Sequence, residues 1–179
     1  PGIHNVENAT GALALLHHLG VDFEVLKKAI ACFKGIKRRY TRHKFADGKI
    51  YVDDYAHHPT ELNAVINSIR EFNPDKKLLV VFQPHLFSRT KDFADGFAES
   101  LSKADELLLL DIYPARELQS DFQGVTSEWL LKKIKIKNKE VCSLGEAFER
   151  IKQKDFDILL TVGAGNIDTL YDPIVEWLS

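Results

Sequence analysis

The chain has 179 residues, of which 45% are hydrophobic and 28% are charged, so it is long enough for one hydrophobic core and a small second unit. A formal net charge of -2 gives no case for binding nucleic acid or an anionic membrane surface, and no apolar run approaches the roughly 20 residues of a membrane-spanning helix. Two cysteines argue against a disulfide framework or a thiolate metal cluster, and we therefore expect a cytoplasmic protein.

Residues 5 to about 34 predict two helices. Apolar residues recur at helical spacing in both, at Val6, Ala9, Leu13 and Leu16 and then at Val25, Leu26, Ala29, Ile30 and Phe33. Gly20 and Gly35 are typical of helix ends, and Asp22 is a candidate N-cap for the second helix. Lys34 to Arg39 then forms a hinge to the rest of the chain.

From Tyr40 onward, strand patterns alternate with helix patterns. Apolar runs typical of strands lie at Ile50 to Val52, Leu78 to Phe82, Leu107 to Leu110 and Asp157 to Val162. Amphipathic helices are indicated by Leu62, Val65, Ile66 and Ile69, by Phe93, Phe97, Ala98 and Leu101, and by a capping box of Ser143 and Glu146. This alternation predicts an α/β fold with a Rossmann-like, mostly parallel sheet and helices on both faces. The basic segment from Lys132 to Lys139 is expected to be a solvated face.

Polar residues follow the apolar runs at the points where strands end. Val52 leads into Asp53-Asp54-Tyr55-Ala56-His57-His58-Pro59, in which Pro59 and Glu61 suit the first turn of a helix. Phe82 leads into Gln83-Pro84-His85, and Val162 into Gly163-Ala164-Gly165. In open α/β sheets, ligands bind where strands end and helices begin, so we expect the active site at these loops.

These motifs resemble those of the Mur ligase family, in the same order along the chain. The matching segments are Gly2-Ile3-His4-Asn5-Val6-Glu7-Asn8, Ile36-Lys37-Arg38-Arg39-Tyr40, Asp53 to Glu61, Gln83-Pro84-His85, Ser88-Arg89-Thr90, Asp111-Ile112-Tyr113-Pro114 and Thr161 to Gly165. Asp-Asp-Tyr-Ala-His-His-Pro is the most specific of them and is similar to the alanine-adding members and to their relative, the muropeptide-recycling ligase. The resemblance implies that residues 1–37 are the last helices of a central ATP-binding domain and that residues 38–179 are the C-terminal, amino-acid-binding domain.

The resemblance implies an ATP-dependent, amide-forming ligase that adds L-alanine to UDP-N-acetylmuramate through an acyl phosphate. The sequence contains no G-x-x-G-K-[ST] phosphate loop, and it begins at Pro1 without Met. We therefore expect a C-terminal fragment, inactive alone, of an enzyme whose N-terminal and central domains are its partners. ATP and Mg²⁺ would be held mainly by that central domain.

On the nucleotide side, the family pattern places Asn8, with Asn5, at adenine, Arg39 at the ATP phosphates and Asp54 at the ribose. Asn5 and Asn8 share a helical face and offer amide groups to a base edge, although helix caps are the alternative. The alternative for Arg39 is an ordinary exposed basic cluster. Asp53 and Asp54 should point to opposite faces of their strand, and we place Asp54 ahead.

On the amino-acid side, the motif suggests His57 and His58 as residues that orient alanine or transfer a proton. A histidine has a pKa near neutrality, which suits that chemistry, but capping of the following helix is an equal alternative. Metal ligation is the weakest reading, because no His or Cys group with metal-ligand spacing accompanies the pair, and we expect no metal site.

The next loops supply the remaining candidates, which are His85, Ser88, Arg89, Thr90, Gly163, Ala164 and Gly165. Arg89 is a candidate partner for the alanine carboxylate, and the glycine-rich turn offers backbone N–H groups to an anion. Four residues depart from the family pattern and leave the edges of the alanine pocket open, namely Leu86, Phe87, Arg116 and Asn166.

Two alternatives remain. A muropeptide-recycling ligase shares this architecture but adds a peptide instead of one amino acid. A nonenzymatic nucleotide-binding module is the other, since the phosphate loop is missing from the sequence.

Overall fold

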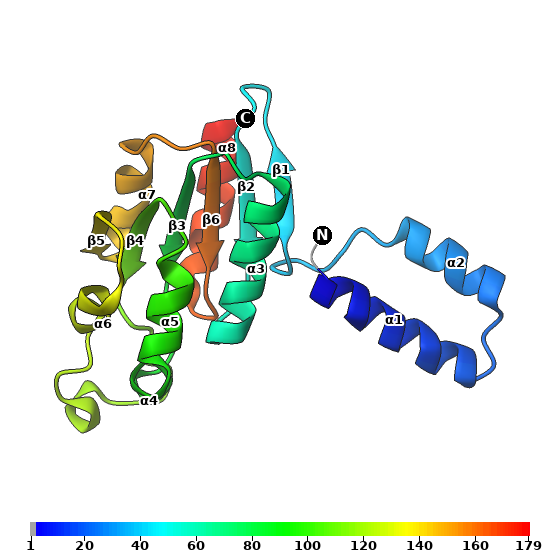
Figure 1. The fold of residues 1–179 in the computed structure, drawn as a ribbon, viewed down its shortest axis with the longest axis horizontal. Helices are drawn as coiled ribbons and strands as arrows, with labels where there is room; N and C mark the ends of the chain where they lie inside the picture. Colours follow the sequence, from blue (N-terminus) through cyan, green and yellow to red (C-terminus); the bar gives the residue numbers. More distant parts are fainter. Residues whose placement is uncertain (1–2) are drawn as a thin grey trace.

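A computed structural model describes residues 3–179 of the chain. Its first two helices, α1 (Ile3–His18) and α2 (Phe23–Cys32), form a hairpin that projects away from an α/β unit (Figure 1). Oδ1 of Asp22 accepts hydrogen bonds from the backbone N–H groups of Glu24 and Val25, so the predicted N-cap is confirmed. The two predicted helices are also confirmed.

The α/β unit is built on a six-stranded sheet with the order β1-β2-β6-β3-β4-β5. The strands are β1 (Thr41–Lys44), β2 (Ile50–Asp54), β3 (Leu78–Phe82), β4 (Glu106–Leu110), β5 (Asn138–Cys142) and β6 (Ile158–Val162). Five of them run parallel, and β1 pairs antiparallel with β2 at one edge. The mostly parallel sheet predicted from the sequence is confirmed.

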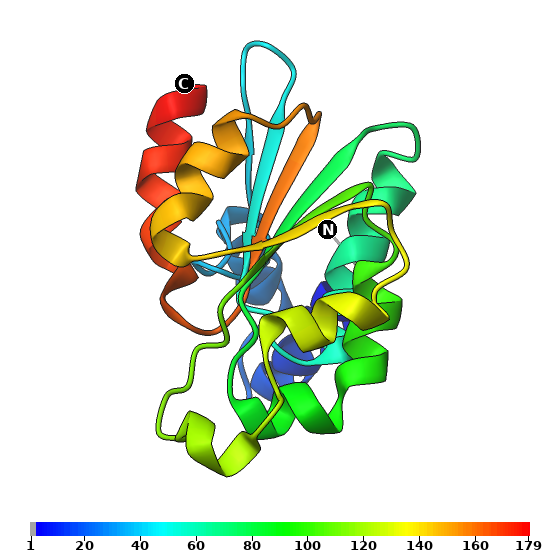
Figure 2. The ribbon, with the colours of Figure 1, turned by 90° about the vertical axis from the view of Figure 1, so that its left-hand side faces the viewer.

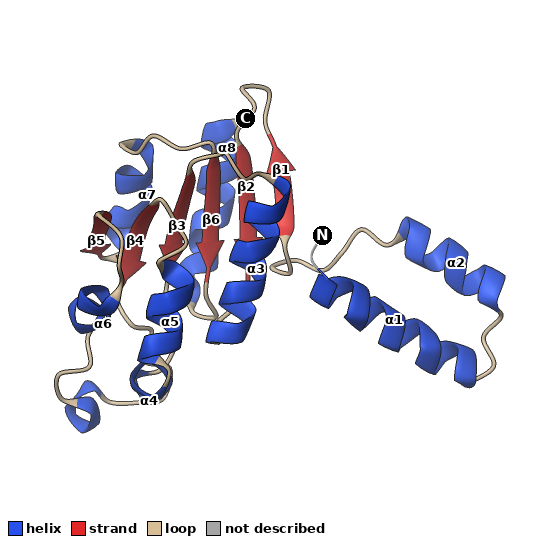
Figure 3. Ribbon diagram, viewed as in Figure 1, coloured by secondary structure: helices blue, strands red, loops and turns tan. Residues whose placement is uncertain are grey.

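Helices cover both faces of the sheet (Figures 2 and 3). One face packs on α3 (Pro59–Phe72), α5 (Ala94–Leu101) and α6 (Ser127–Lys133), and the other on α7 (Leu144–Lys152) and α8 (Tyr171–Leu178). Shorter segments are α4 (Phe87–Asp92) and the 3₁₀ turns η1 (Gln119–Phe122) and η2 (Asn166–Leu170). Because side chains alternate along a strand, Val80 and Phe82 face the first helix layer while Leu79 and Val81 face the second.

Several details differ from the sequence-based expectations. The helix expected around Phe93 to Leu101 is confirmed as α5, but the sequence pattern does not identify the short helix α4 that precedes it. The sequence pattern does not identify the antiparallel edge strand β1. The pattern also does not identify the edge strand β5. The expectation that Lys132 to Lys139 is a solvated face is confirmed for Lys132, Lys133, Lys135 and Lys137, which are exposed, whereas Lys139 is half-buried and its Nζ donates to the carbonyls of Leu131 and Ile134.

The helical hairpin keeps much of its apolar surface exposed. Val6 on α1 is 57% exposed and Val25 on α2 is 56% exposed, whereas Leu26 is buried. In most proteins, a large exposed apolar patch marks an interaction site. Among the described residues, none of the helices has the length and apolar character required to cross a membrane.

Candidate functional site

The candidate site lies at the carboxyl edge of the sheet. Strands β2, β6, β3 and β4 are parallel neighbours, so the loops that follow them meet at one edge. These loops carry most of the residues predicted from the sequence, and the helical hairpin joins the sheet at the same edge through Arg38 to Tyr40, just before β1. Beyond β3 and β4, the parallel pairing continues as a bridge between His85 and Tyr113.

His58 caps helix α3. Its Nδ1 accepts a hydrogen bond from the backbone N–H of Thr60 at 3.3 Å, and Glu61 accepts in return from the backbone N–H of His58 at 3.3 Å. The ring of His58 lies edge-on to Phe93, with 4.6 Å between centroids. Pro59 opens the helix, as predicted. The capping alternative for His58 is therefore observed, and a role at the substrate stays a prediction.

His57 turns toward the other loops. Its Nδ1 lies 3.0 Å from the carbonyl oxygen of Tyr55, and its backbone N–H donates to Glu61 at 3.0 Å. The centroid of its ring is 6.2 Å from that of His85 and 5.3 Å from that of Tyr55. His57 and His85 thus form a pair of imidazoles from two different strand ends.

His85 and Arg89 form the centre of the second loop. Nη1 of Arg89 lies 3.3 Å from Nδ1 of His85, and the His85 ring stacks on Tyr113 with centroids 5.6 Å apart. Burial, followed by the charge of Arg89 and the neighbouring His57, lowers the pKa of His85 from its usual 6.5. The imidazole of His85 is therefore kept neutral beside a cation that is suited to an anionic partner.

Ser88 and Thr90 are engaged within the fold. Glu117 accepts hydrogen bonds from the backbone N–H of Ser88 at 3.0 Å and from its hydroxyl, and so ties α4 to the loop after β4. Thr90 is fully buried, and its hydroxyl donates to the carbonyl of Leu86 at 2.7 Å. Both hydroxyls support α4, and their proposed contacts to substrate stay predictions.

The glycine turn after β6 packs tightly on the loop after β3. A Cβ on Gly163 would lie 2.6 Å from the carbonyl oxygen of Gln83, and one on Gly165 would lie 2.8 Å from Tyr113. Gln83 also accepts from the backbone N–H of Ile167 and donates to the side chain of Asn166. The small residues thus allow a close approach between two loops of the site.

Tyr55 lies between the hinge residues Arg38 and Arg39 and His57 of the candidate site. The guanidinium carbon of Arg38 lies 4.9 Å from the centroid of the Tyr55 ring and that of Arg39 lies 5.9 Å from it. Arg39 itself is exposed. Asp54 is only 7% exposed, and its two oxygens accept from the backbone N–H groups of Tyr40 at 2.7 Å and Ala56 at 2.8 Å. A ribose hydroxyl would be a further donor to this carboxylate.

Asp53 points to the opposite face of β2, as predicted. It is 1% exposed, it accepts a hydrogen bond from the hydroxyl of Thr161 at 2.9 Å, and Nε of Arg38 lies 3.8 Å from its carboxylate. Burial raises the pKa of Asp53, and the Thr161 hydroxyl and Arg38 oppose that rise. Both carboxylates are thus built into the fold.

The structure does not bring Asn5 and Asn8 to the sheet. Both lie on α1, inside the helix rather than at its cap, and the hairpin stands apart from the strands (Figure 1). Their assignment to adenine stays a prediction. Of the residues that depart from the family pattern, Phe87 is buried in a small cluster with Ile112, while Arg116 is exposed.

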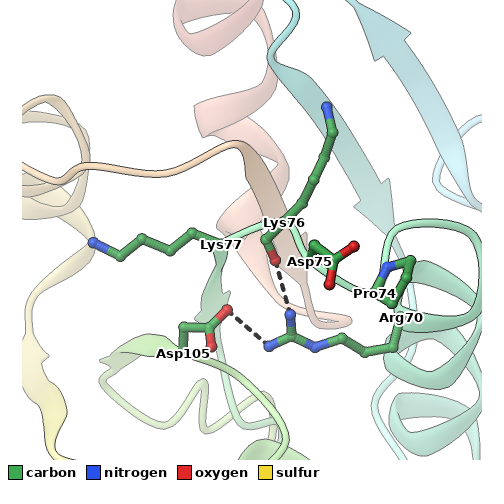
Figure 4. Close-up of a pocket in the computed structure, with 6 residues that line it drawn as sticks. All are labelled: Arg70, Pro74, Asp75, Lys76, Lys77 and Asp105. Carbon is green, nitrogen blue, oxygen red and sulfur yellow. Dashed lines mark hydrogen bonds and ion pairs between the residues drawn. The ribbon is translucent and has the colours of Figure 1, made fainter.

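A hollow of about 320 Å³ lies at the opposite, amino edge of the sheet, between Arg70, Pro74 to Lys77 and Asp105 (Figure 4). Arg70 uses its guanidinium to donate to the carbonyls of Lys76 and Lys103 and to the carboxylate of Asp105. Because these bonds hold the fold together and the loops of the site lie at the other edge, we assign Arg70 a structural role.

A second hollow of about 300 Å³ lies beside α4 and is lined by Asp111 and Glu128 among others. Burial and the neighbouring Glu128 and Glu146 raise the pKa of Asp111. Such acidic walls repel carboxylates and phosphates. Within the described residues, no group of three or more His, Cys, Asp or Glu side chains is arranged to hold a metal ion.

Comparison with known proteins shows the family to which the α/β unit belongs. The family model described as "Mur ligase, glutamate ligase domain" matches residues 38–165, which is most of the chain and contains every loop of the site. The chain belongs to the Mur ligase family.

Three residues at this edge, Arg38, Tyr55 and Glu117, are not among the candidates from the sequence, although Arg38 and Tyr55 stand inside the matching motifs.

The relatives that match carry a consistent name. A UDP-N-acetylmuramate–L-alanine ligase from Flavobacterium johnsoniae is 49% identical over the whole chain, which covers 39% of that relative's length. The crystal structure of the Thermotoga maritima UDP-N-acetylmuramate-alanine ligase matches 99% of the chain at 28% identity, with a TM-score of 0.78, and the chain covers 38% of it. A murein peptide ligase from Psychrobacter arcticus shares the fold, with 23% identity, a TM-score of 0.67, and coverage of 99% of this chain and 37% of its own. The chain thus spans about two fifths of the length of the Mur ligases that it matches.

Proposed function

We propose that the chain is the C-terminal part of an ATP-dependent ligase that joins L-alanine to UDP-N-acetylmuramate. The observation that carries the proposal is the assembly of His57, His85 and Arg89 at the edge of the sheet where the hinge enters, with His85 stacked on Tyr113, against which Gly165 packs. The 49% identity to a named ligase of this specificity supports it. Because the reaction consumes ATP, we assign it to the cytoplasm.

Arg89 is the proposed anchor for the alanine carboxylate. A guanidinium binds a carboxylate with two parallel hydrogen bonds and stays charged at any working pH. Its Nη1 is held 3.3 Å from His85, so the cation faces the same space as the two imidazoles. An anchored carboxylate fixes the direction in which the amino group of alanine can attack.

His85 and His57 are the proposed proton acceptors. The ammonium group of alanine must lose a proton before its nitrogen can attack an acyl phosphate. Because its pKa is lowered, His85 has a neutral ring near neutral pH, and this ring can accept that proton. The centroid of the His57 ring lies 6.2 Å from that of His85. The stacked Tyr113 keeps the His85 ring in a fixed orientation.

ATP supplies the phosphoryl group that activates the muramate carboxylate. Of this chain's residues, Arg39 fits its phosphates, since its guanidinium is exposed at the domain hinge and accessible to an anion. Asp54 fits the ribose less directly, because both carboxylate oxygens already accept backbone N–H groups. We assign the phosphate loop and the Mg²⁺ ligands to the domain that precedes this chain in the full enzyme.

The same proposal divides the chain at residue 37. Residues 1–37 would complete the central ATP-binding domain, which would cover the exposed apolar faces of α1 and α2. Residues 38–179 would form the amino-acid-binding domain. UDP-N-acetylmuramate would enter between these two units and an N-terminal domain.

The test is phosphate release by the full-length enzyme that contains this chain. Release should require ATP, UDP-N-acetylmuramate and L-alanine together, and the 179-residue chain alone should release none. Activity with a muropeptide in place of L-alanine would assign the protein to peptide recycling instead. Binding of ATP without any acceptor-dependent release would leave only a nucleotide-binding module and overturn the proposal.

A further inference from the structure

Arg38 contacts four residues at the ends of two neighbouring strands, β2 and β6. Its Nη2 donates to the carbonyl of Gly163 at 2.5 Å, its Nη1 lies 3.5 Å from the carboxylate of Asp168, and its Nε lies 3.8 Å from that of Asp53. Its guanidinium also faces the ring of Tyr55. The side chain of Arg38 is 19% exposed and that of Asp53 is 2% exposed, so their contact is shielded from water, whereas Asp168 is 49% exposed.

The backbone of the hinge turn, residues 36–40, is equally constrained. Arg38 and Tyr40 both have positive φ, at 59° and 55°, in a region that non-glycine residues rarely adopt. Three hydrogen bonds hold them there. The backbone N–H of Arg38 donates to the Thr41 hydroxyl, that of Tyr40 donates to Asp54, and the carbonyl of Arg38 accepts from Tyr55. Arg39 lies between these two residues, so the turn sets the direction of its side chain.

Arg38 contacts the glycine turn, Gly163–Gly165, of the proposed amino-acid site. Gly163 has a φ of +147° and no room for a Cβ against Gln83, and its backbone N–H donates to the carbonyl of Asp54. The turn is therefore held by Gln83 on one side and by Arg38 and Asp54 on the other. Arg38 belongs to the hinge turn, and its side chain reaches this glycine turn.

A series of buried hydrogen bonds lies next to the contact between Arg38 and Asp53. The hydroxyl of Thr161 donates to Asp53 at 2.9 Å and lies 2.8 Å from the hydroxyl of Tyr51, which is fully buried. Asp53 is thus held between Thr161 and Arg38. An uncompensated carboxylate at this depth is strongly unfavourable, so the buried Asp53 favours a position of the Arg38 guanidinium beside it.

From these contacts we propose that Arg38 is a positioning residue that fixes the hinge turn carrying Arg39 to the Gly163–Gly165 turn of the amino-acid site. The phosphate-side cation and the alanine pocket then move as one body when the domains close. The inference rests on the proposed function for its kinetic part and on geometry alone for the coupling of the two segments.

The test uses the full-length enzyme with Arg38→Gln, Arg38→Lys and Asp168→Asn, and Lys37→Gln as the control on the exposed neighbouring residue. Hydrogen exchange is measured by mass spectrometry in peptides that cover 36–40 and 162–168. Arg38→Gln should speed exchange in both segments by about tenfold or more, the factor expected for loss of a charge-assisted hydrogen bond. Asp168→Asn should do so more weakly, and Lys37→Gln should do neither.

Kinetics separate a positioning role from a merely structural one. Arg38→Lys keeps a charge beside Asp53 and should restore most of the melting temperature. It cannot span Gly163, Asp53 and Asp168 together, so the KM for L-alanine should stay about tenfold raised while the KM for ATP stays within about twofold.

Faster hydrogen exchange at residues 36–40 alone, or a normal KM for L-alanine in Arg38→Lys, would overturn the proposed positioning role of Arg38. If the wild-type enzyme does not use L-alanine, the proposed function fails. The exchange data then decide the coupling independently.

Discussion

Glu117 caps the first turn of helix α4 from a loop that is 29 residues away from Ser88 in sequence. Leu86, the residue at the N-cap position, has a φ of 70° and supplies no side-chain hydrogen bond, so the carboxylate of Glu117 takes over that function. This contact fastens the loop after β4 against the helix that carries Arg89. It explains why a candidate substrate-binding serine is occupied within the fold.

Glu117→Gln should therefore lower the free energy of unfolding by about 1 kcal/mol, as for loss of a helix cap. Burial opposes ionisation of Glu117, but the hydrogen bonds from Ser88 and Phe87 hold its pKa below the usual value. The contribution is thus present above the ordinary glutamate pKa and is lost as the pH falls through the lower folded value. Urea unfolding of both proteins at pH 7 and pH 3 checks this. Equal stabilities at pH 7 would show that the cap contributes nothing.

The sequence predicts the central strands well for a simple physical reason. Runs such as Leu78–Phe82 are buried on both faces, so they are apolar throughout. The edge strand β5, Asn138–Cys142, is partly solvated and carries Lys139 and Glu140, so its pattern resembles a charged surface segment. The same reason hides β1, whose residues alternate between half-buried and exposed.

The candidate site is also only partly predictable from the sequence. Motifs at strand ends predict His57, His85 and Arg89 as site residues, and the structure brings these three side chains together. The sequence alone does not predict that Arg38 points into the fold while Arg39 is exposed. This difference follows from the left-handed backbone of the hinge turn, which is held by contacts with Asp54 and Tyr55. The partner of Ser88 is likewise set by a loop that no local pattern specifies.

The environment of His85 gives a second prediction. In the 179-residue chain, the pKa of His85 should lie below 6.5, and Arg89→Ala should raise it because a neighbouring cation is removed. A neutral His85 stabilises the folded state fully above pH 6.5, and this contribution is lost as the pH falls toward the folded pKa. An NMR titration of the ring measures the value. Lys91→Ala, which removes an exposed charge from the same helix, is the control and should leave the titration unchanged.

Arg89→Ala tests the division of the site in the full-length enzyme. Loss of a charged hydrogen-bond partner for the alanine carboxylate should raise the KM for L-alanine by roughly 10- to 100-fold, with the KM for ATP nearly unchanged. Steady-state kinetics with each substrate varied in turn give both constants. A rise in the KM for ATP instead would place Arg89 on the nucleotide side.

Arg39→Ala should reduce turnover far more than stability. The side chain is exposed in this structure, so its loss removes little packing. A cation that meets the phosphates after domain closure is worth on the order of 10² to 10³ in rate. Turnover and melting temperature of the full-length enzyme are compared with those of Arg42→Ala, an exposed arginine on β1. Near-normal turnover combined with early melting would make Arg39 structural.

The glycine turn provides the most direct test of the geometry at the site. Gly163→Ala places a Cβ 2.6 Å from the backbone oxygen of Gln83, at a φ of +147° that side chains rarely adopt. Because backbone cannot move aside as a flexible side chain does, the turn must shift, at about 1–3 kcal/mol in the free energy of unfolding. The shift should also weaken L-alanine binding in the full-length enzyme.

Gly145→Ala is the matched control, since Gly145 lies in helix α7 and a methyl group added there would have no neighbouring atom within 4 Å. Alanine is the better helix former by roughly 0.5–1 kcal/mol, so this variant should gain stability. Urea unfolding of both variants of the 179-residue chain should therefore show changes of opposite sign from the same chemical substitution. A Gly163→Ala protein as stable as the wild type would mean that the turn has room to relax, and the close packing of the two loops would not be what shapes the pocket.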